Sequence, residues 1–107
     1  MDNRTIAAIA TPNAPGGIGI IRISGENALE IAAKIFRPVS GTDITASKGY
    51  RAYFGNVYDN NEKIDEAVCL VFRAPRSYTG EDTVEISCHG GVKVSSMVLE
   101  TVMLTCI

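Results

Sequence analysis

The sequence predicts an α+β domain with a mostly antiparallel sheet and about two helices. Short apolar runs rich in β-branched residues recur along the chain, and two segments carry apolar residues at helical spacing. The predicted order is strand, strand, helix, three strands, helix. At 107 residues the chain is long enough for one domain with a sizeable core, so we treat residues 1–107 as a single unit.

The first half of the chain contains two predicted strands and one helix. Residues 5–11 (TIAAIAT) form a short apolar run, and residues 18–24 (IGIIRIS) are dense in isoleucine. Ser24 and Gly25 are typical helix-capping residues, so we expect a helix from Glu26 to about Arg37 that ends before Pro38. The apolar stripe of this helix is Ala28, Ile31, Ala32, Ile35 and Phe36.

The second half of the chain contains three predicted strands and a second helix. Residues 39–48 are rich in Ser, Thr and Gly and indicate a loop, whereas 50–58 and 64–74 indicate strands joined by a hairpin turn at 59–62. A further short strand is expected over 83–88. From Gly90 onward the chain is predicted to be helical because of the spacing of four apolar residues, Val94, Met97, Val98 and Val102.

The composition excludes several classes of site. The net charge is −2 and no basic cluster is present, so no dedicated nucleic-acid surface is visible. The three cysteines show no CxxC spacing, which argues against a zinc site or a disulfide framework and favours reduced thiols. We therefore expect no metal site. No apolar run reaches membrane-spanning length and no signal peptide is evident, so we expect a cytoplasmic protein with no membrane partner.

Arg22 is a candidate binding residue because it interrupts a run of isoleucines. Strand alternation places it on one face with Ile20 and Ser24. A guanidinium on a mostly apolar strand needs an anionic or carbonyl partner, either a ligand or an acid of the chain such as Glu85 or Asp82. The glycines before it enter a strand rather than open a helix, and no GxxxxGK[ST] motif occurs, so no nucleotide-phosphate loop is predicted.

Glu85 is the second candidate binding residue. It shares a strand face with Thr83 and Ser87, while the intervening apolar residues point to the core. One interpretation is an ordinary exposed glutamate. The other is a carboxylate that accepts two parallel N–H bonds from a planar heterocycle with an amidine-like edge, a strong and specific geometry. We expect residues 16–25 and 73–91 to form two walls of one ligand site.

The remaining polar residues do not predict catalysis. His89 is the single histidine and lies at the expected start of the last helix, where free amide groups suit an anion. A histidine in that position is more often a cap than a general base. Cys88 faces inward by alternation and is interpreted as a small core residue. No proton-transfer pair is evident, so no catalytic residue is assigned.

Two motifs resemble the MnmE (TrmE) family of bacterial tRNA-modification GTPases. The first is residues 5–11 followed by 16–25 (GGIGIIRISG), and the second is residues 74–82 (APRSYTGED) followed by Glu85 and residues 88–91 (CHGG). Both are long and occur in the family's order and spacing. The resemblance covers nearly the whole chain but only the N-terminal part of the family's protein.

The resemblance implies a fold similar to the folate-binding domain of the glycine-cleavage T protein. The implied ligand is a tetrahydrofolate such as 5-formyltetrahydrofolate, a one-carbon source, with Arg22 and Glu85 matching folate-contacting residues of the family. It further implies a homodimer and, for the full-length family, GTP, Mg and K ions, a flavin-dependent partner MnmG (GidA), and modification of the wobble uridine of tRNA.

Residues 1–107 match a folate-binding and dimerisation domain that we expect to be truncated at its C-terminal end, without the GTPase domain and the catalytic cysteine. The leading hypothesis is thus a binding module without catalysis of its own. Two alternatives stay open: a pure dimerisation domain, and a small stand-alone folate-dependent one-carbon transferase, for which His89 and Asp82 are the available acid–base candidates.

Overall fold

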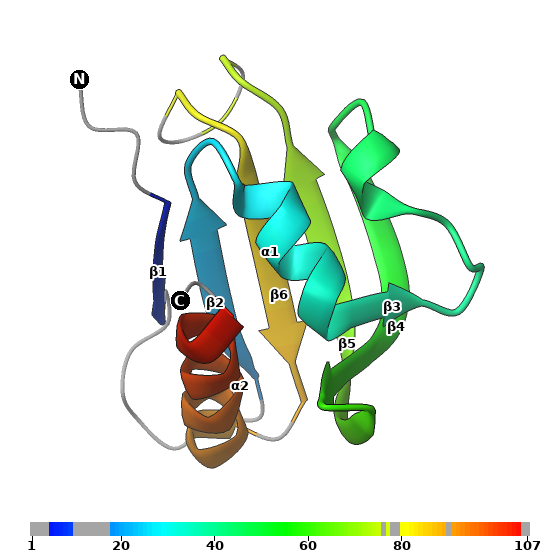
Figure 1. Cartoon of the computed structure of the whole chain (residues 1–107), viewed down its shortest axis with the longest axis vertical. Coiled ribbons are helices and arrows are strands. Elements are labelled where there is room, and N and C mark those ends of the chain that lie inside the picture. The colour runs from blue at the N-terminus through cyan, green and yellow to red at the C-terminus, as the bar shows by residue number, and fades with distance from the viewer. Residues whose placement is uncertain (1–4, 10–17, 76, 78–79, 90, 106–107) are drawn as a thin grey trace.

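The chain folds into one six-stranded antiparallel sheet with two α-helices packed on one of its faces (Figure 1). This computed structural model describes residues 5–9, 18–75, 77, 80–89 and 91–105. The strand order is β1-β2-β6-β5-β4-β3. The predicted α+β class with an antiparallel sheet is confirmed. The part of the predicted first strand beyond Ile9, and the glycines at 16 and 17, lie outside the described residues.

The centre of the sheet brings together segments far apart in the sequence. Strand β2 (Gly19–Ser24) pairs along its whole length with β6 (Thr83–Cys88), and β6 pairs with β5 (Glu62–Phe72). At one edge β1 (Ile6–Ile9) pairs with β2, and beyond β5 lies β4 (Arg51–Asp59). The two segments that were predicted to form two walls of one site, residues 16–25 and 73–91, therefore contain adjacent strands, β2 and β6.

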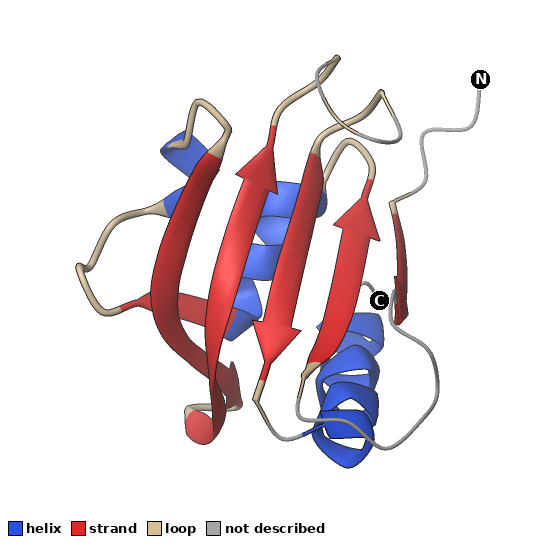
Figure 2. Ribbon diagram, turned by 180° about the vertical axis from the view of Figure 1, so that it is seen from behind, coloured by secondary structure: helices blue, strands red, loops and turns tan. Residues whose placement is uncertain are grey.

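The two faces of the sheet differ because both helices cover the same side. Figure 2, seen from behind, presents the strands with both helices behind them. Buried side chains of the strands alternate toward the helices and form the core with α1 and α2; the strand residues in this core include Ile21, Ile23, Val57, Ala67, Cys69, Val71, Val84, Ile86 and Cys88. We call the other side the helix-free face. It carries the alternate residues of each strand.

The first helix, α1 (Ala28–Ile35), is shorter than predicted. Its expected stripe is buried, together with Leu29. The prediction of a cap at Ser24-Gly25 is wrong: the N-cap residue is Asn27, whose backbone N–H donates to Thr5 Oγ1 at 3.0 Å. The prediction that the helix extends to Arg37 is also wrong. Residues Phe36–Pro38 instead form β3, an edge strand on β4, because pairing with Gly55–Val57 satisfies their backbone groups.

The β4–β5 hairpin agrees with the prediction. Asn60 and Asn61 have positive φ values of 49° and 71°, as a tight hairpin turn requires. In the loop before β4, residues Ile44–Ala46 form a short 3-10 helix, η1, which the sequence did not predict; the Asp43 side chain accepts a hydrogen bond from Thr45 N at its start. Ile44 anchors this loop because it is fully buried in the core.

The last helix, α2 (Gly91–Thr105), lies beside β1 and β2 and against α1 (Figure 1). Val98 and Val102 are buried, as the predicted stripe requires, and Val94 packs against the core. Met97 was assigned to the same stripe wrongly, since it is 46% exposed; Thr101 is buried instead, and its hydroxyl donates to Met97 O. Within the described residues, no helix is both long and apolar enough to cross a membrane.

Candidate functional site

Arg22 and Glu85 form an ion pair at the centre of the helix-free face. The two residues are direct register partners on β2 and β6, so their side chains leave the same face of the sheet. Arg22 Nε and Nη2 lie 2.7 and 2.6 Å from the same carboxylate oxygen, Glu85 Oε2. The sequence offered Glu85 or Asp82 as a partner for Arg22, and the structure selects Glu85.

Apolar residues flank this pair along its row of the sheet. Leu70 is opposite Glu85 on β5, and Ala8 is opposite Arg22 on β1. Glu85 is only 8% exposed although no helix covers this face, so the interpretation of an ordinary exposed glutamate is wrong. A carboxylate removed from water is stabilised by charge-assisted hydrogen bonds, which Arg22 provides.

Asp82 lies just before β6 and interacts with the loop after β5 rather than with Arg22. Its Oδ1 accepts from the backbone N–H of Ala74 at 2.8 Å and lies 3.4 Å from Arg73 Nε. Its backbone O accepts from Gly25 N at 3.0 Å, so residue 82 also joins this loop to the end of β2. Asp82 therefore holds together the ends of three strands.

His89 lies at the opposite end of β6 and contacts Asp65. The backbone N–H of His89 donates to Asp65 Oδ2 at 2.7 Å, and its Nδ1 lies 4.0 Å from Asp65 Oδ1. The Asp65 carboxylate thus accepts from a backbone N–H just before α2, the place where the sequence suggested that an anionic ligand could bind. Because β6 separates Asp82 from His89 by roughly 23 Å at 3.2–3.4 Å per residue, the two candidate acid–base residues are not brought together.

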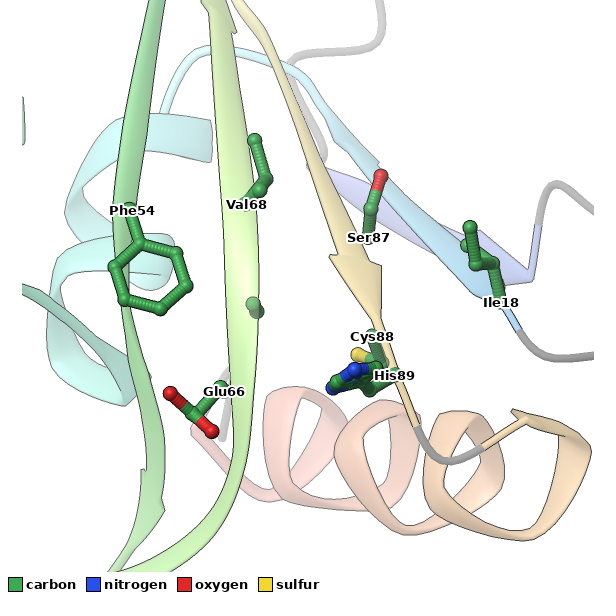
Figure 3. A pocket seen from close by; sticks show the side chains of 8 residues that line it. Ile18, Phe54, Glu66, Val68, Ser87, Cys88 and His89 are labelled. Atoms are coloured by element: carbon green, nitrogen blue, oxygen red, sulfur yellow. The ribbon is translucent and has the colours of Figure 1, made fainter.

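Beside the ion pair, the helix-free face is hollowed. A cavity of about 390 Å³ opens there, and Figure 3 shows its side chains, which come from β4, β5, β6, Ile18 just before β2 and His89 just after β6. Phe54, Val68 and Ile18 are 51%, 39% and 64% exposed, more than large apolar residues usually are in a packed domain. The remaining lining residues are Glu66, Ala67, Ser87, Cys88 and His89. We call this cavity the β5–β6 hollow.

The hollow was not predicted from the sequence. Its apolar residues alternate with buried ones on β4 and β5: Phe54 precedes Gly55, and Val68 lies between Ala67 and Cys69. The detectable signal was apolar side chains on both faces of two consecutive strands. That pattern alone does not show that Val68 lies between Phe54 and Ser87. This arrangement depends on the β4–β5 and β5–β6 registers, in which Val68 is opposite both residues.

The two thiols near the site, Cys69 and Cys88, are buried, and their pKa values are raised. Burial raises the pKa of Cys69 to about 12. Burial, and then the charge of Asp65, raise the pKa of Cys88 to about 11. Cys88 faces the core, as predicted. Within the described part of the chain, no three His, Cys, Asp or Glu side chains are grouped in a way that could hold a metal ion.

Comparison with known proteins gives a consistent picture. A protein called tRNA modification GTPase MnmE from Moorella thermoacetica is 50% identical over 103 residues, which is 94% of this chain and 22% of that protein. The protein of the same name from Chlorobaculum tepidum is 48% identical over 99 residues, 92% of this chain and 21% of that protein. The chain thus spans about a fifth of the length of these curated relatives.

The family model described as "GTP-binding protein TrmE N-terminus" matches residues 5–106. That range includes both motifs, the Arg22–Glu85 pair, the β5–β6 hollow and both helices. Since the match extends over nearly the whole sequence, the chain belongs to the TrmE N-terminal family of the MnmE tRNA-modification GTPases.

Proposed function

We propose that this chain is a folate-binding and dimerising module of a tRNA-modification GTPase, and that it binds a tetrahydrofolate derivative such as 5-formyltetrahydrofolate. The observation that carries the proposal is the Arg22–Glu85 pair on the helix-free face. It joins the two segments on which the family resemblance rests, and it presents a cation and an anion side by side among apolar residues.

The chemistry of this pair suits a folate. A folate has a heterocycle with hydrogen-bond donors, an aromatic middle part, and carbonyl and carboxylate groups. Arg22 offers a planar set of donors for a carbonyl or carboxylate, and Glu85 offers acceptor oxygens for N–H groups. Leu70 and Val68 lie next to the pair on β5 and supply apolar area for the rings. When bound, the 5-formyl derivative would supply a one-carbon unit.

The homodimer is the second part of the proposal. The helix-free face exposes several large apolar side chains, namely Ile6, Ile18, Phe54 and Val68. Exposed apolar area of this kind commonly marks a protein–protein interface or a ligand-binding groove. A dimer formed through this face would cover the ligand site, so ligand binding and dimerisation are expected to influence each other.

The relatives of this chain are named tRNA modification GTPases. We propose that a protein containing this module modifies the wobble uridine of tRNA in the cytoplasm together with a flavin-dependent partner, MnmG (GidA). GTP, Mg²⁺ and K⁺ would bind to a GTPase domain elsewhere in that protein. This module would contribute the folate and the dimer contact, with no catalytic residue of its own.

Calorimetric titration of the chain with 5-formyltetrahydrofolate tests the proposal, with Arg22→Ala and Glu85→Gln as variants. We expect saturable binding by the parent chain and a loss of about 2–5 kcal/mol of binding free energy in each variant, because each change leaves a charged partner uncompensated. Sedimentation of the same samples reports dimerisation. A parent chain that dimerises and binds no folate would favour the pure dimerisation domain.

A further inference from the structure

We propose that a notch at the tip of the β4–β5 hairpin binds one unpaired nucleotide of an RNA, with the base on the guanidinium of Arg37 and the phosphate on Lys34. The choice of RNA as the partner rests on the proposed function, in which the longer protein acts on tRNA. The site itself rests on the residues that line a cavity of about 400 Å³ between the hairpin tip and the end of α1. We call this cavity the hairpin notch.

The hairpin notch is separate from the Arg22–Glu85 pair and from the β5–β6 hollow. Its described lining residues come from the last turn of α1, from β3, from the hairpin tip and from α2, and Figure 1 shows this tip at the foot of the sheet. None of them lines the hollow. Along β4, Tyr58 at the notch lies roughly 20 Å from Ala52, which belongs to the row of the ion pair. A ligand at the ion pair would therefore leave the notch free.

Arg37 is held in place before any ligand binds. Its guanidinium carbon lies 4.3 Å from the centre of the Tyr58 ring, and its Nη2 donates to Asn61 Oδ1 at 2.8 Å. Because Arg37 is exposed, the guanidinium face that turns away from Tyr58 is open to a second planar group. A preorganised guanidinium loses little conformational entropy on binding, and unpaired RNA bases stack well on such planes.

Lys34 supplies the charge for a phosphate. It lies in the last turn of α1, is exposed, and lines the same notch as Arg37. Among the residues that the structure describes, none forms a hydrogen bond or an ion pair with its ammonium group. An ammonium is a compact charge on a flexible stem, so Lys34 can follow a phosphate while Arg37 keeps the base in place.

The remaining polar groups of the notch favour a nucleotide over an isolated phosphate. Asp59 lines the notch beside the two cations and would repel a small anion. Its carboxylate can instead accept from a ribose 2′-hydroxyl or from an amino group of a base. Asn60 and Asn61, which the tight turn fixes at positive φ, add amide groups that both donate and accept.

The charge of the chain limits the size of this contact. The net charge is −2, and Glu62 and Lys63, which follow the hairpin tip outside the notch lining, offset each other. An extended RNA tract requires a basic groove along its backbone. The notch fits a single nucleotide, which agrees with the absence of a basic cluster in the sequence.

The test measures binding of a short fluorescein-labelled single-stranded RNA to the full 107-residue chain by fluorescence anisotropy. The variants at the notch are Lys34→Ala, Arg37→Ala and Arg37→Lys. Lys48→Ala and Arg51→Ala are matched controls, because both side chains are exposed cations outside the notch. The same RNA annealed into a duplex, and inorganic phosphate added at constant ionic strength, distinguish a stacked base from a simple anion contact.

We expect the parent chain to bind the single strand more tightly than the duplex. Arg37→Ala should weaken binding by about tenfold, the loss expected for one stacked base, and Arg37→Lys should lose most of the same affinity although it keeps the charge. Lys34→Ala should lower the slope of log affinity against log salt by roughly 0.7, the value for one phosphate contact on a single strand. Both control variants should bind like the parent chain.

Lys34→Ala keeps the notch testable if Arg37→Ala fails to fold, because alanine suits an exposed helical position. Equal weakening by all four alanine variants would indicate a general charge effect and overturn the inference. Equal affinity of Arg37→Lys and the parent chain, displacement of the RNA by phosphate alone, or no RNA binding by the parent chain would overturn it as well.

Calorimetry with 5-formyltetrahydrofolate on the same samples separates this inference from the proposed function. Intact folate binding without RNA binding overturns this inference alone. RNA binding that depends on Arg37 and Lys34, without any folate binding, overturns the folate part of the proposed function alone. Binding of neither ligand overturns both.

Discussion

Glu85 is nearly buried on a sheet face that no helix covers, and Arg22, its register partner across β2 and β6, is the residue that neutralises it. The side chain of Arg22 is 37% exposed, whereas that of Glu85 is 11% exposed. The carboxylate therefore depends on a cation that is itself in contact with water. This asymmetry means that loss of Arg22 affects both the fold and any ligand that binds there.

Replacing Arg22 by methionine is expected to destabilise the fold. The change leaves the Glu85 carboxylate at a poorly hydrated position without its cation, and we expect the free energy of unfolding to fall by about 1–3 kcal/mol after allowance for the exposure of Arg22. Urea denaturation measures this. The double variant Arg22→Met with Glu85→Gln removes both charges and should recover part of the loss. Strictly additive effects of the two substitutions would contradict the coupling.

Asp65 is expected to stabilise the entry to α2. Asp65→Ala removes the acceptor of the His89 backbone N–H, so we expect a loss of about 1–2 kcal/mol in the free energy of unfolding. Asp65→Asn retains a side-chain oxygen and should cost less. Asp59→Ala, at an exposed position at the end of β4, is the control and should be nearly neutral. Equal stability of Asp65→Ala and Asp59→Ala would show that this hydrogen bond contributes nothing.

Gly25 is expected to tolerate no side chain, because Thr5 occupies the space beside it. Its φ is +141°, and a Cβ there would lie 2.5 Å from Thr5 Cα. Gly25→Ala would displace Thr5, whose Oγ1 accepts a hydrogen bond from Asn27 N just before α1. We expect a loss of about 2 kcal/mol or more in thermal or urea unfolding. Gly41→Ala is a matched control: its φ of +78° is also unfavourable for alanine, but no atom lies within 4 Å, so about 1 kcal/mol is expected.

The buried thiols are expected to make the fold sensitive to alkaline pH. The pKa values of Cys69 and Cys88 are raised in the folded chain from 9.0 to about 12 and about 11. The unfolded chain therefore ionises first, and their contribution to stability, complete below about pH 9, is lost as the pH rises toward the folded values.

Thiol labelling with a maleimide at pH 8 measures the burial on which this expectation rests, on a Cys106→Ser background that leaves these two cysteines. The folded chain should label slowly and the urea-unfolded chain rapidly, since the thiolate is the reactive form. Rapid labelling of the folded chain at either position would contradict burial of that thiol.

Local patterns in the sequence were sufficient for most of the fold. The isoleucine run of β2 and the alternation in β6 identified the strands and the inward-facing residues, and the stripe of α1 identified its buried face. The end of α1 was predicted wrongly because Phe36 continues the helical spacing. Its backbone instead pairs with β4, a contact with Val57 that lies 21 positions further along the sequence and has no local signature.

The candidate site was predicted only in part for the same reason. The chemistry of a lone arginine on an apolar strand indicated an acidic partner, and Glu85 was one of two candidates. Which candidate it is depends on the β2–β6 register, and a register spanning 63 residues cannot be derived from either strand alone. The β5–β6 hollow gave no local signal, because its lining residues come together only when β4, β5 and β6 are assembled.

Because both helices lie on one face of the sheet, the six residues of β6 alternate between two environments, the core and the helix-free face. Val84, Ile86 and Cys88 are constrained by volume, whereas Thr83, Glu85 and Ser87 are constrained by what lies above the sheet. Substitutions at Glu85 or Ser87 can therefore change the helix-free face without repacking the core. The same arrangement forbids a slip of a single residue, because inserting one amino acid in β6 would turn a carboxylate into the core and an isoleucine out of it.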